Sequence, residues 1–322
     1  FEGIICPGFV NAHCHLELSH LLGITEKGKG FLDFLATVRA RNNFTKEEIK
    51  IAIENAEQQM IANGIVGVGD ICNTTDTLLQ KRKGNLQYYN FIETFQINEK
   101  KIKETLTSAK VIRNEFRNSG MKATIAPHSP YSVPPKLMEE ISNSFDDEDE
   151  LLTIHMQETS DENQLFEKRD GKLLEWLESI HASSRIWEKR NNSTDVLKEL
   201  GSKKTLLVHN TFAKKEDMTD NYYCTCPKAN LYIENALPNY SIFDTDKLCV
   251  GTDSLASNNS LSILKELQII RENSDFDLNT LLKIASKNGA EALGFERLGT
   301  FEKGKIPGMN LIKGFDEIKV IV

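Results

Sequence analysis

Short β-rich segments alternate with longer amphipathic segments along most of this 322-residue chain. Parallel strands need a crossover of about a dozen or more residues between them, and an amphipathic helix supplies one of that length. The pattern predicts strands at 9–13, 65–72, 86–95, 122–126, 151–156, 205–209, 222–226 and 247–251. It predicts helices at 46–62, 101–116, 135–144, 162–178, 260–271 and 278–292.

Eight such strand–helix units in roughly 250 residues match the size of a closed (β/α)₈ barrel. An open doubly wound sheet is the main alternative, but no glycine-rich phosphate-binding turn follows the first predicted strand. We therefore predict an α/β fold, a (β/α)₈ TIM-like barrel that spans residues 7–298.

The two ends of the chain do not follow this alternation. Glycine and proline interrupt the C-terminal tail, and strand-like segments follow at 310–312 and 317–322. These segments cannot extend a closed barrel, so 1–6 and 299–322 are predicted to form a small accessory β-layer. The chain starts without Met inside a strand-like segment, which leads us to expect residues upstream of Phe1.

The charge and hydropathy of the chain argue against several classes of partner. Lys and Arg number 39 against 47 Asp and Glu, a net charge of −8, and no basic cluster offsets it. Nucleic acids and anionic membranes require concentrated positive charge, so neither is an expected partner. No apolar run approaches the ~20 residues that span a bilayer, and no signal-peptide pattern is present. Six cysteines without a CxxC pair favour reduced, buried thiols in a cytoplasmic protein.

Polar residues gather at the predicted carboxyl ends of the strands, where a barrel of this kind builds its active site. Five of the seven histidines fall there: His13, His15, His128, His155 and His209. The other polar residues at these ends are Asp70, Glu93, Glu158, Asn230 and Asp253. The sequence therefore predicts one polar site on that face of the barrel.

Four of these residues form a candidate metal-binding set. His13 and His15 are two residues apart on a strand, so their imidazoles share a face. Such a pair alone is more often two histidines satisfied by polar neighbours than a pair of ligands. Together with His155 and Asp253, however, the set has three imidazoles and a carboxylate. It leaves a coordination position open for water, as a catalytic zinc site requires.

Several motifs of the chain resemble, in order, those of the amidohydrolase superfamily. The segment 7–17 (PGFVNAHCHLE) looks like the first-strand signature of this family. Further matching motifs are PHSPY (127–131), HMQET (155–159), VHN (208–210), CPKAN (226–230) and GTDS (251–254). The resemblance covers nearly the whole chain and is strongest to the aminohydrolase/chlorohydrolase branch, which includes adenosine-derivative deaminases, guanine deaminases and triazine hydrolases. It implies a barrel hydrolase, with the accessory layer as the remnant of a β-sandwich.

The resemblance also implies roles for individual residues. The residues that match the metal ligands are His13, His15, His155 and Asp253. Glu158 matches the acid that protonates a ring nitrogen, His209 the histidine that hydrogen-bonds the metal-bound water, and His128 a substrate-side histidine. Asp253 also takes part in catalysis, because it can take the proton of the water and pass it to the leaving ammonia. Binuclear relatives carry a carboxylated lysine where this chain has His128, which favours one divalent ion, Zn²⁺ or alternatively Fe²⁺.

Other assignments depend on weaker arguments. The further residues predicted to bind substrate are Glu17, His20 and Asn230, although an ordinary loop accounts for the first two equally well. Asp70 and Glu93 are either pocket residues or charges satisfied at the rim of the barrel. We interpret Trp176 and Trp187 as packing groups.

The leading hypothesis is a mononuclear metal-dependent deaminase that releases ammonia from a purine-like or other N-heterocyclic amine. A hydrolytic dechlorinase or a formimino deiminase could use the same site with a different leaving group. A third hypothesis is a catalytically silent metal-binding protein, but such a protein has no need of Glu158 and His209. A small-molecule substrate is the partner that the sequence predicts, and homo-oligomer formation stays open.

Overall fold

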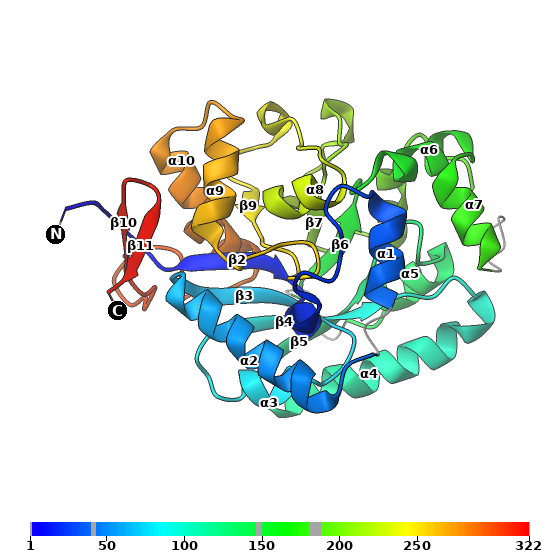
Figure 1. Cartoon of the computed structure of the whole chain (residues 1–322). Coiled ribbons are helices and arrows are strands. Elements are labelled where there is room, and N and C mark those ends of the chain that lie inside the picture. The colour runs from blue at the N-terminus through cyan, green and yellow to red at the C-terminus, as the bar shows by residue number, and fades with distance from the viewer. Residues whose placement is uncertain (1, 40–42, 146–149, 181–187, 322) are drawn as a thin grey trace.

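Eight parallel strands form the centre of the computed structural model, which describes residues 2–39, 43–145, 150–180 and 188–321 (Figure 1). One four-stranded sheet contains β2 (Phe9–Cys14), β3 (Ile65–Cys72), β4 (Gln87–Thr94) and β5 (Lys122–Pro127). The other contains β6 (Leu152–Met156), β7 (Thr205–His209), β8 (Tyr222–Thr225) and β9 (Leu248–Val250). Within each sheet the strands pair in chain order, so neighbouring carboxyl ends point the same way.

Backbone hydrogen bonds join the two sheets at both seams. At one seam the N–H of His155 donates to the carbonyl of His128 at 2.9 Å. At the other, the N–H groups of Thr252 and Asp253 both donate to the carbonyl of His13 at 3.1 Å. A Cβ at Gly251 would lie 2.7 Å from that carbonyl oxygen, so glycine is what allows the close approach. The strands thus close into the predicted barrel.

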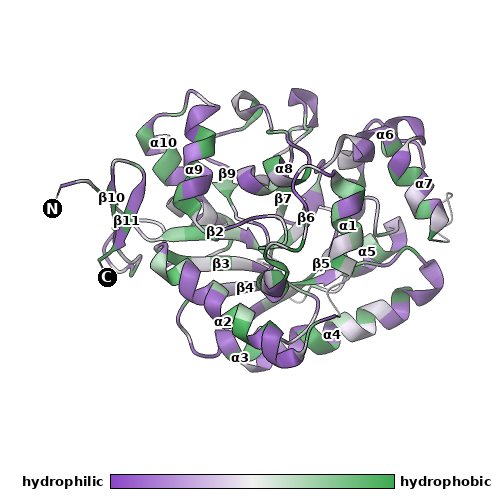
Figure 2. Ribbon diagram, in the orientation of Figure 1, coloured by the Kyte–Doolittle hydropathy of each residue, from purple (hydrophilic) through white to green (hydrophobic). Residues whose placement is uncertain are grey.

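Helices cover the outside of this barrel (Figure 1). They are α1 (Phe31–Arg39), α2 (Lys46–Ala62), α3 (Leu78–Lys81), α4 (Ile102–Asn118), α5 (Pro135–Ser142), α6 (Ser160–Lys168), α7 (Lys172–Ser179), α8 (Pro227–Ile233), α9 (Ile263–Glu272), α10 (Leu278–Leu282) and α11 (Asn288–Ala292). Figure 2 shows hydrophilic and hydrophobic residues interspersed along α2 and α9, as expected of helices with one buried side. None of the described helices is long and apolar enough to cross a membrane.

Two of the predicted helices differ from the structure. The predicted helix 162–178 is two helices, α6 and α7, because Arg169 (φ 54°) and Gly171 (φ 101°) leave the helical region between them. The predicted helix 278–292 contains a π-helical turn, Lys283–Lys287, between α10 and α11. The sequence pattern did not predict α1, α3 and α8, which are short helices in the connections between strands.

An antiparallel three-stranded sheet joins the two ends of the chain. Strand β10 (Asn310–Lys313) pairs with both β1 (Ile4–Cys6) and β11 (Glu317–Val320). Figure 1 shows this small sheet beside the barrel, close to both termini. An accessory β-layer is therefore present, whereas its division from the barrel at 7–298 stays a proposal. Phe1 and Val322 lie outside the described residues.

Candidate metal-binding active site

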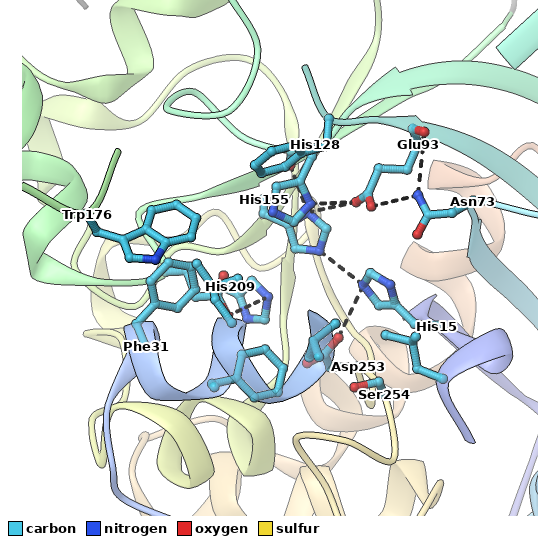
Figure 3. Close-up of a pocket in the computed structure, with 16 residues that line it drawn as sticks. His15, Phe31, Asn73, Glu93, His128, His155, Trp176, His209, Asp253 and Ser254 are labelled. Atoms are coloured by element: carbon cyan, nitrogen blue, oxygen red, sulfur yellow. Dashed lines mark hydrogen bonds and ion pairs between the residues drawn. The ribbon is translucent and has the colours of Figure 1, made fainter. Parts of the chain in front are cut away.

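A cavity of about 470 Å³ lies at the carboxyl ends of the barrel strands (Figure 3). Its polar side, the floor, includes His15, Glu93, His128, His155, Glu158, His209, Asp253 and Ser254. Its apolar side, the wall, consists of Leu18, Phe31, Phe34, Leu35, Val38, Phe95 and Trp176. Figure 3 shows Phe31 and Trp176 across the cavity from His15 and Glu93. The volume is typical of a small-molecule site.

Three imidazoles and a carboxylate converge at this floor, with His13 directly beneath the cavity. The Nε2 atom of His15 lies 3.2 Å from that of His13 and 3.1 Å from that of His155. Oδ1 of Asp253 lies 3.5 Å and 3.4 Å from Nε2 of His13 and His15. Ligands at about 2.0–2.1 Å from a tetrahedral Zn²⁺ are roughly 3.3–3.4 Å apart. The distances from His15 to His13 and His155, and from Asp253 to His13 and His15, therefore match the spacing of ligands around one ion.

Neighbouring groups orient these candidate ligands. Nδ1 of His155 lies 2.8 Å from the carbonyl oxygen of His128, so its N–H can donate there and its Nε2 lone pair faces the cluster. The hydroxyl of Ser257 donates to Oδ2 of Asp253, which leaves Oδ1 for the histidines. Partners of this kind fix the rotamer of a ligand before an ion binds.

The backbone at the strand ends is strained where the site requires it. His209 (φ 71°), Asn210 (φ 52°) and Asp253 (φ 55°) adopt positive φ, and so does Gln157 (φ 50°) before Glu158. Such conformations cost on the order of 1–3 kcal/mol for residues other than glycine and concentrate at functional sites. Here they turn the chain out of β6, β7 and β9 towards the cavity.

The electrostatics of the cluster suit a cation. Burial lowers the pKa of His13 to about 4, and burial together with His128 holds the pKa of His155 well below its ordinary value. The carboxyl of Asp253 is also buried, but its hydrogen bond with His13 and the charge of His15 bring its pKa below the usual range. A neutral imidazole at His13 and at His155, beside an ionised Asp253, suits metal binding, which needs deprotonated ligands.

Glu158 differs from the candidate ligands. Burial, followed by repulsion from Asp253, raises its pKa well above the ordinary value, so the protonated form is favoured. Its Oε1 lies 3.7 Å from Nε2 of His209. Nδ1 of His209 lies 2.8 Å from Oδ1 of Asn230, so that N–H donates to Asn230 and Nε2 faces the cavity as an acceptor. Glu158 can thus donate a proton, and His209 presents an oriented acceptor.

Only some of the residues that were predicted to bind substrate line the cavity. His128 lines the cavity, and its Nδ1 lies 2.7 Å from Oε1 of Glu93, which lines the cavity too. Asn230 is not among the lining residues, because it lies behind His209 and orients it. Of the predicted substrate residues, His128 is therefore the one in direct reach of a ligand on this side.

Glu17 and His20 also lie outside the lining of the cavity. The carboxylate of Glu17 accepts hydrogen bonds from the N–H groups of Asn73 and Thr74, at 3.0 and 3.1 Å, and so holds the loop after β3. The ring of His20 packs edge-on against Phe44, with 4.8 Å between centroids. Neither residue is therefore in direct reach of a ligand in the cavity.

The wall of the cavity was not predicted from the sequence. Four wall residues have the spacing i, i+3, i+4, i+7 of one helical face: Phe31, Phe34, Leu35 and Val38. This periodicity could have predicted the helix α1. Trp176 lines the cavity as well as packing against the core, so its interpretation as a packing group was incomplete. Trp187 lies outside the described residues.

The model of the Amidohydrolase family matches residues 4–322, and the chain belongs to this family. This match confirms the resemblance, and the fold that the resemblance implied.

Among curated proteins, an adenosine deaminase of Helicobacter pylori is 26% identical over 98% of this chain and 80% of its own length. A 5-methylthioadenosine/S-adenosylhomocysteine deaminase of Bacillus cytotoxicus is 25% identical over 94% of this chain and 71% of its own length. Among solved structures, aminofutalosine deaminase of Helicobacter pylori in complex with methylthio-coformycin has a TM-score of 0.83 and 25% identity. The match covers 96% of this chain and 78% of that one.

Proposed function

We propose that this protein is a metal-dependent deaminase that releases ammonia from the adenine ring of a nucleoside-like small molecule. The observation that carries the proposal is the position of Glu158, a buried carboxyl that lines the cavity beside the His/Asp cluster and whose pKa burial raises. The named relatives, which are deaminases of adenosine derivatives, support the same reaction. We further propose a cytoplasmic location, in keeping with six free and buried cysteines.

The proposed cofactor is a single divalent ion, Zn²⁺ or alternatively Fe²⁺. The residues that would hold it are His13, His15, His155 and Asp253, whose spacing fits one ion. When bound, such an ion lowers the pKa of a water molecule and so supplies a nucleophile at neutral pH.

Side chains of the floor carry out the proton transfers of the reaction. When water adds to the ring carbon that bears the amino group, negative charge develops on the adjacent ring nitrogen, and Glu158 donates its proton there. His209 accepts a hydrogen bond from the attacking water through Nε2. Asp253 takes the proton of that water and passes it to the amine. The C–N bond then breaks as the hydroxyl on the ring carbon returns its proton to Glu158, and the products are ammonia and the ring carbonyl.

The wall of the cavity favours substrates with an apolar substituent on the sugar side. Seven apolar or aromatic side chains form it, and four of them come from one face of α1. None of the described lining residues is Lys or Arg, so the described part of the wall offers no cation to a phosphate. We therefore propose an adenine nucleoside whose sugar carries an alkyl, thioether or aryl group.

A substrate panel tests this function. Zinc-loaded protein is assayed for ammonia release from adenosine, 5′-methylthioadenosine, adenosine 5′-monophosphate, guanine and cytosine, and for chloride release from 6-chloropurine riboside. We expect the highest kcat/KM for 5′-methylthioadenosine and the lowest among the adenine compounds for the monophosphate. Metal-stripped protein is the control. Chloride release without ammonia release from any amino compound would contradict the proposal and favour the dechlorinase.

A further inference from the structure

A buried ion pair lies behind the floor and outside the lining of the cavity. The side chains of Lys81, in α3, and Asp70, in β3, are both 0% exposed, and Nζ of Lys81 lies 2.5 Å from Oδ2 of Asp70. The same ammonium group donates to Oδ1 of Asn90 at 2.7 Å and to Sγ of Cys72 at 3.2 Å. An ammonium has three hydrogens to donate, and here each has an acceptor.

The second oxygen of Asp70 connects this pair to the candidate metal site. Oδ1 of Asp70 accepts a hydrogen bond from the N–H of Leu16 at 2.8 Å. Leu16 directly follows His15 and begins the 3₁₀ helix Leu16–Leu21, where the chain leaves β2. Its N–H is among the first of a helix, which have no acceptor within the helix. The carboxylate of Asp70 therefore holds the peptide that follows a candidate metal ligand.

A gain in folding stability does not by itself explain why the chain has a buried ion pair here. Desolvation of the two charges can cost as much as their attraction returns, and apolar pairs of similar volume are often equally stable. The ammonium remains charged here: burial lowers the pKa of Lys81, but Asp70 and Cys72 raise it by more. A carboxylate held by a fixed cation keeps one orientation, and orientation is what a group behind a metal ligand supplies.

We propose that Lys81 and Asp70 act as positioning residues for metal binding. Lys81 fixes the carboxylate of Asp70, Asp70 fixes the peptide N–H of Leu16, and this contact sets the orientation of the His15 imidazole. The inference rests on the proposed role of His15 as a ligand and is independent of the substrate.

Two double variants separate this role from a structural one. Both variants carry Lys81→Met and so lack the ion pair. The Asn variant adds Asp70→Asn, which keeps an oxygen that can accept from the N–H of Leu16. The Leu variant adds Asp70→Leu, which has no such oxygen. Zinc affinity is measured by chelator competition, and the absorption spectrum of the Co²⁺-loaded protein reports the ligand geometry. We expect the Leu variant to bind zinc about 10–100-fold more weakly than the parent, and the Asn variant to stay within a few-fold of it.

Glu57→Gln is the matched control, because the hydrogen bonds of this buried carboxylate are with Gln80, Asn85 and Tyr88 and not with Asp70, Lys81 or Leu16. Glu57 accepts from the hydroxyl of Tyr88 at 2.8 Å and from Nδ2 of Asn85 at 2.9 Å. We expect this variant to lower the Tm and to leave zinc affinity unchanged. Equal zinc affinity in the two double variants, or a loss of affinity that follows Tm in all three proteins, would overturn the proposal.

A second comparison applies if the Leu variant does not fold. Lys81→Met alone leaves Asp70 without its cation, and we expect weaker zinc binding. Adding Asp70→Asn should restore zinc affinity, because a neutral amide can accept from Leu16 without a cation to hold it. Failure of the second substitution to restore affinity would contradict the proposal.

Discussion

The floor and the wall of the cavity are built in different ways. The floor consists of side chains at the ends of barrel strands, such as His155 on β6 and His209 on β7, and hydrogen bonds across the seams hold it. The wall consists mainly of α1 and Trp176 of α7, which lie in connections between strands. This difference indicates that the barrel fixes the reaction, whereas the connections select the substrate.

Burial separates the floor from part of the wall only, because Leu18 and Phe31 of the wall are 5% and 3% exposed. The floor residues His155, Glu158 and His209 are no more than 6% exposed, and each has a charged or hydrogen-bonding neighbour. On the wall, Phe34 is only half-buried and Phe95 is 42% exposed. Truncation of Phe34 or Phe95 should therefore change the binding of substrate with little effect on the fold, whereas the floor tolerates little change.

The largest predicted effect follows from removal of a floor ligand. His13→Ala or Asp253→Ala leaves three ligands, which hold Zn²⁺ poorly, so we expect loss of bound metal and of ammonia release. Elemental analysis of the purified variants measures the metal, and the parent should saturate near one equivalent per chain. Val38→Ala, on the wall, is the control and should keep its metal. Full metal content in both ligand variants would remove these residues from the site.

The floor was largely predictable from the sequence, and the wall was not. Strand periodicity and the alternation of strands with helices are local signals. The parallel barrel that they predict brings His13, His155 and Asp253 to one end. No local signal shows that Asp70 turns away from the cavity towards Lys81, because the two residues meet only through packing between β3 and α3. The helix α1 had the right periodicity but is short and lies in a connection between strands, where tertiary contacts decide.

An intermediate effect is expected at the wall. Phe34→Ala removes part of an apolar surface that an apolar substituent would cover, with a loss of about 1–1.5 kcal/mol and a KM roughly 10-fold higher for 5′-methylthioadenosine. The kcat and KM for adenosine should change little, because it lacks that substituent. Steady-state assays of both substrates measure the difference. Equal changes for the two substrates would show that the wall does not select the substituent.

A further predicted effect concerns stability and its pH dependence, away from the lining of the cavity. Burial raises the pKa of Glu162 from 4.5 to about 8 in the folded protein, and its Oε1 accepts from the N–H of Gln157 at 2.9 Å. Between pH 4.5 and pH 8, Glu162 is therefore protonated in the folded state and ionised in the unfolded state. This contribution to stability is complete below pH 4.5 and is lost as the pH rises through 8.

Glu162→Gln should accordingly flatten the fall in the free energy of unfolding between pH 5 and pH 8. Urea unfolding of the parent and of the variant at several pH values measures the difference. Glu266, whose pKa burial also raises to about 8, remains in both proteins, so its contribution cancels. Parallel pH dependence in the two proteins would contradict the assignment of this proton to Glu162.

The most direct test of the account is the variant Glu158→Gln, assayed for metal content and for ammonia release from 5′-methylthioadenosine. If Glu158 is the proton donor and not a ligand, the variant keeps its fold and one equivalent of metal. Its kcat/KM falls by about 10²–10⁴, or roughly 3–5 kcal/mol of transition-state stabilisation. Loss of metal would make Glu158 a ligand, and undiminished ammonia release would contradict the mechanism.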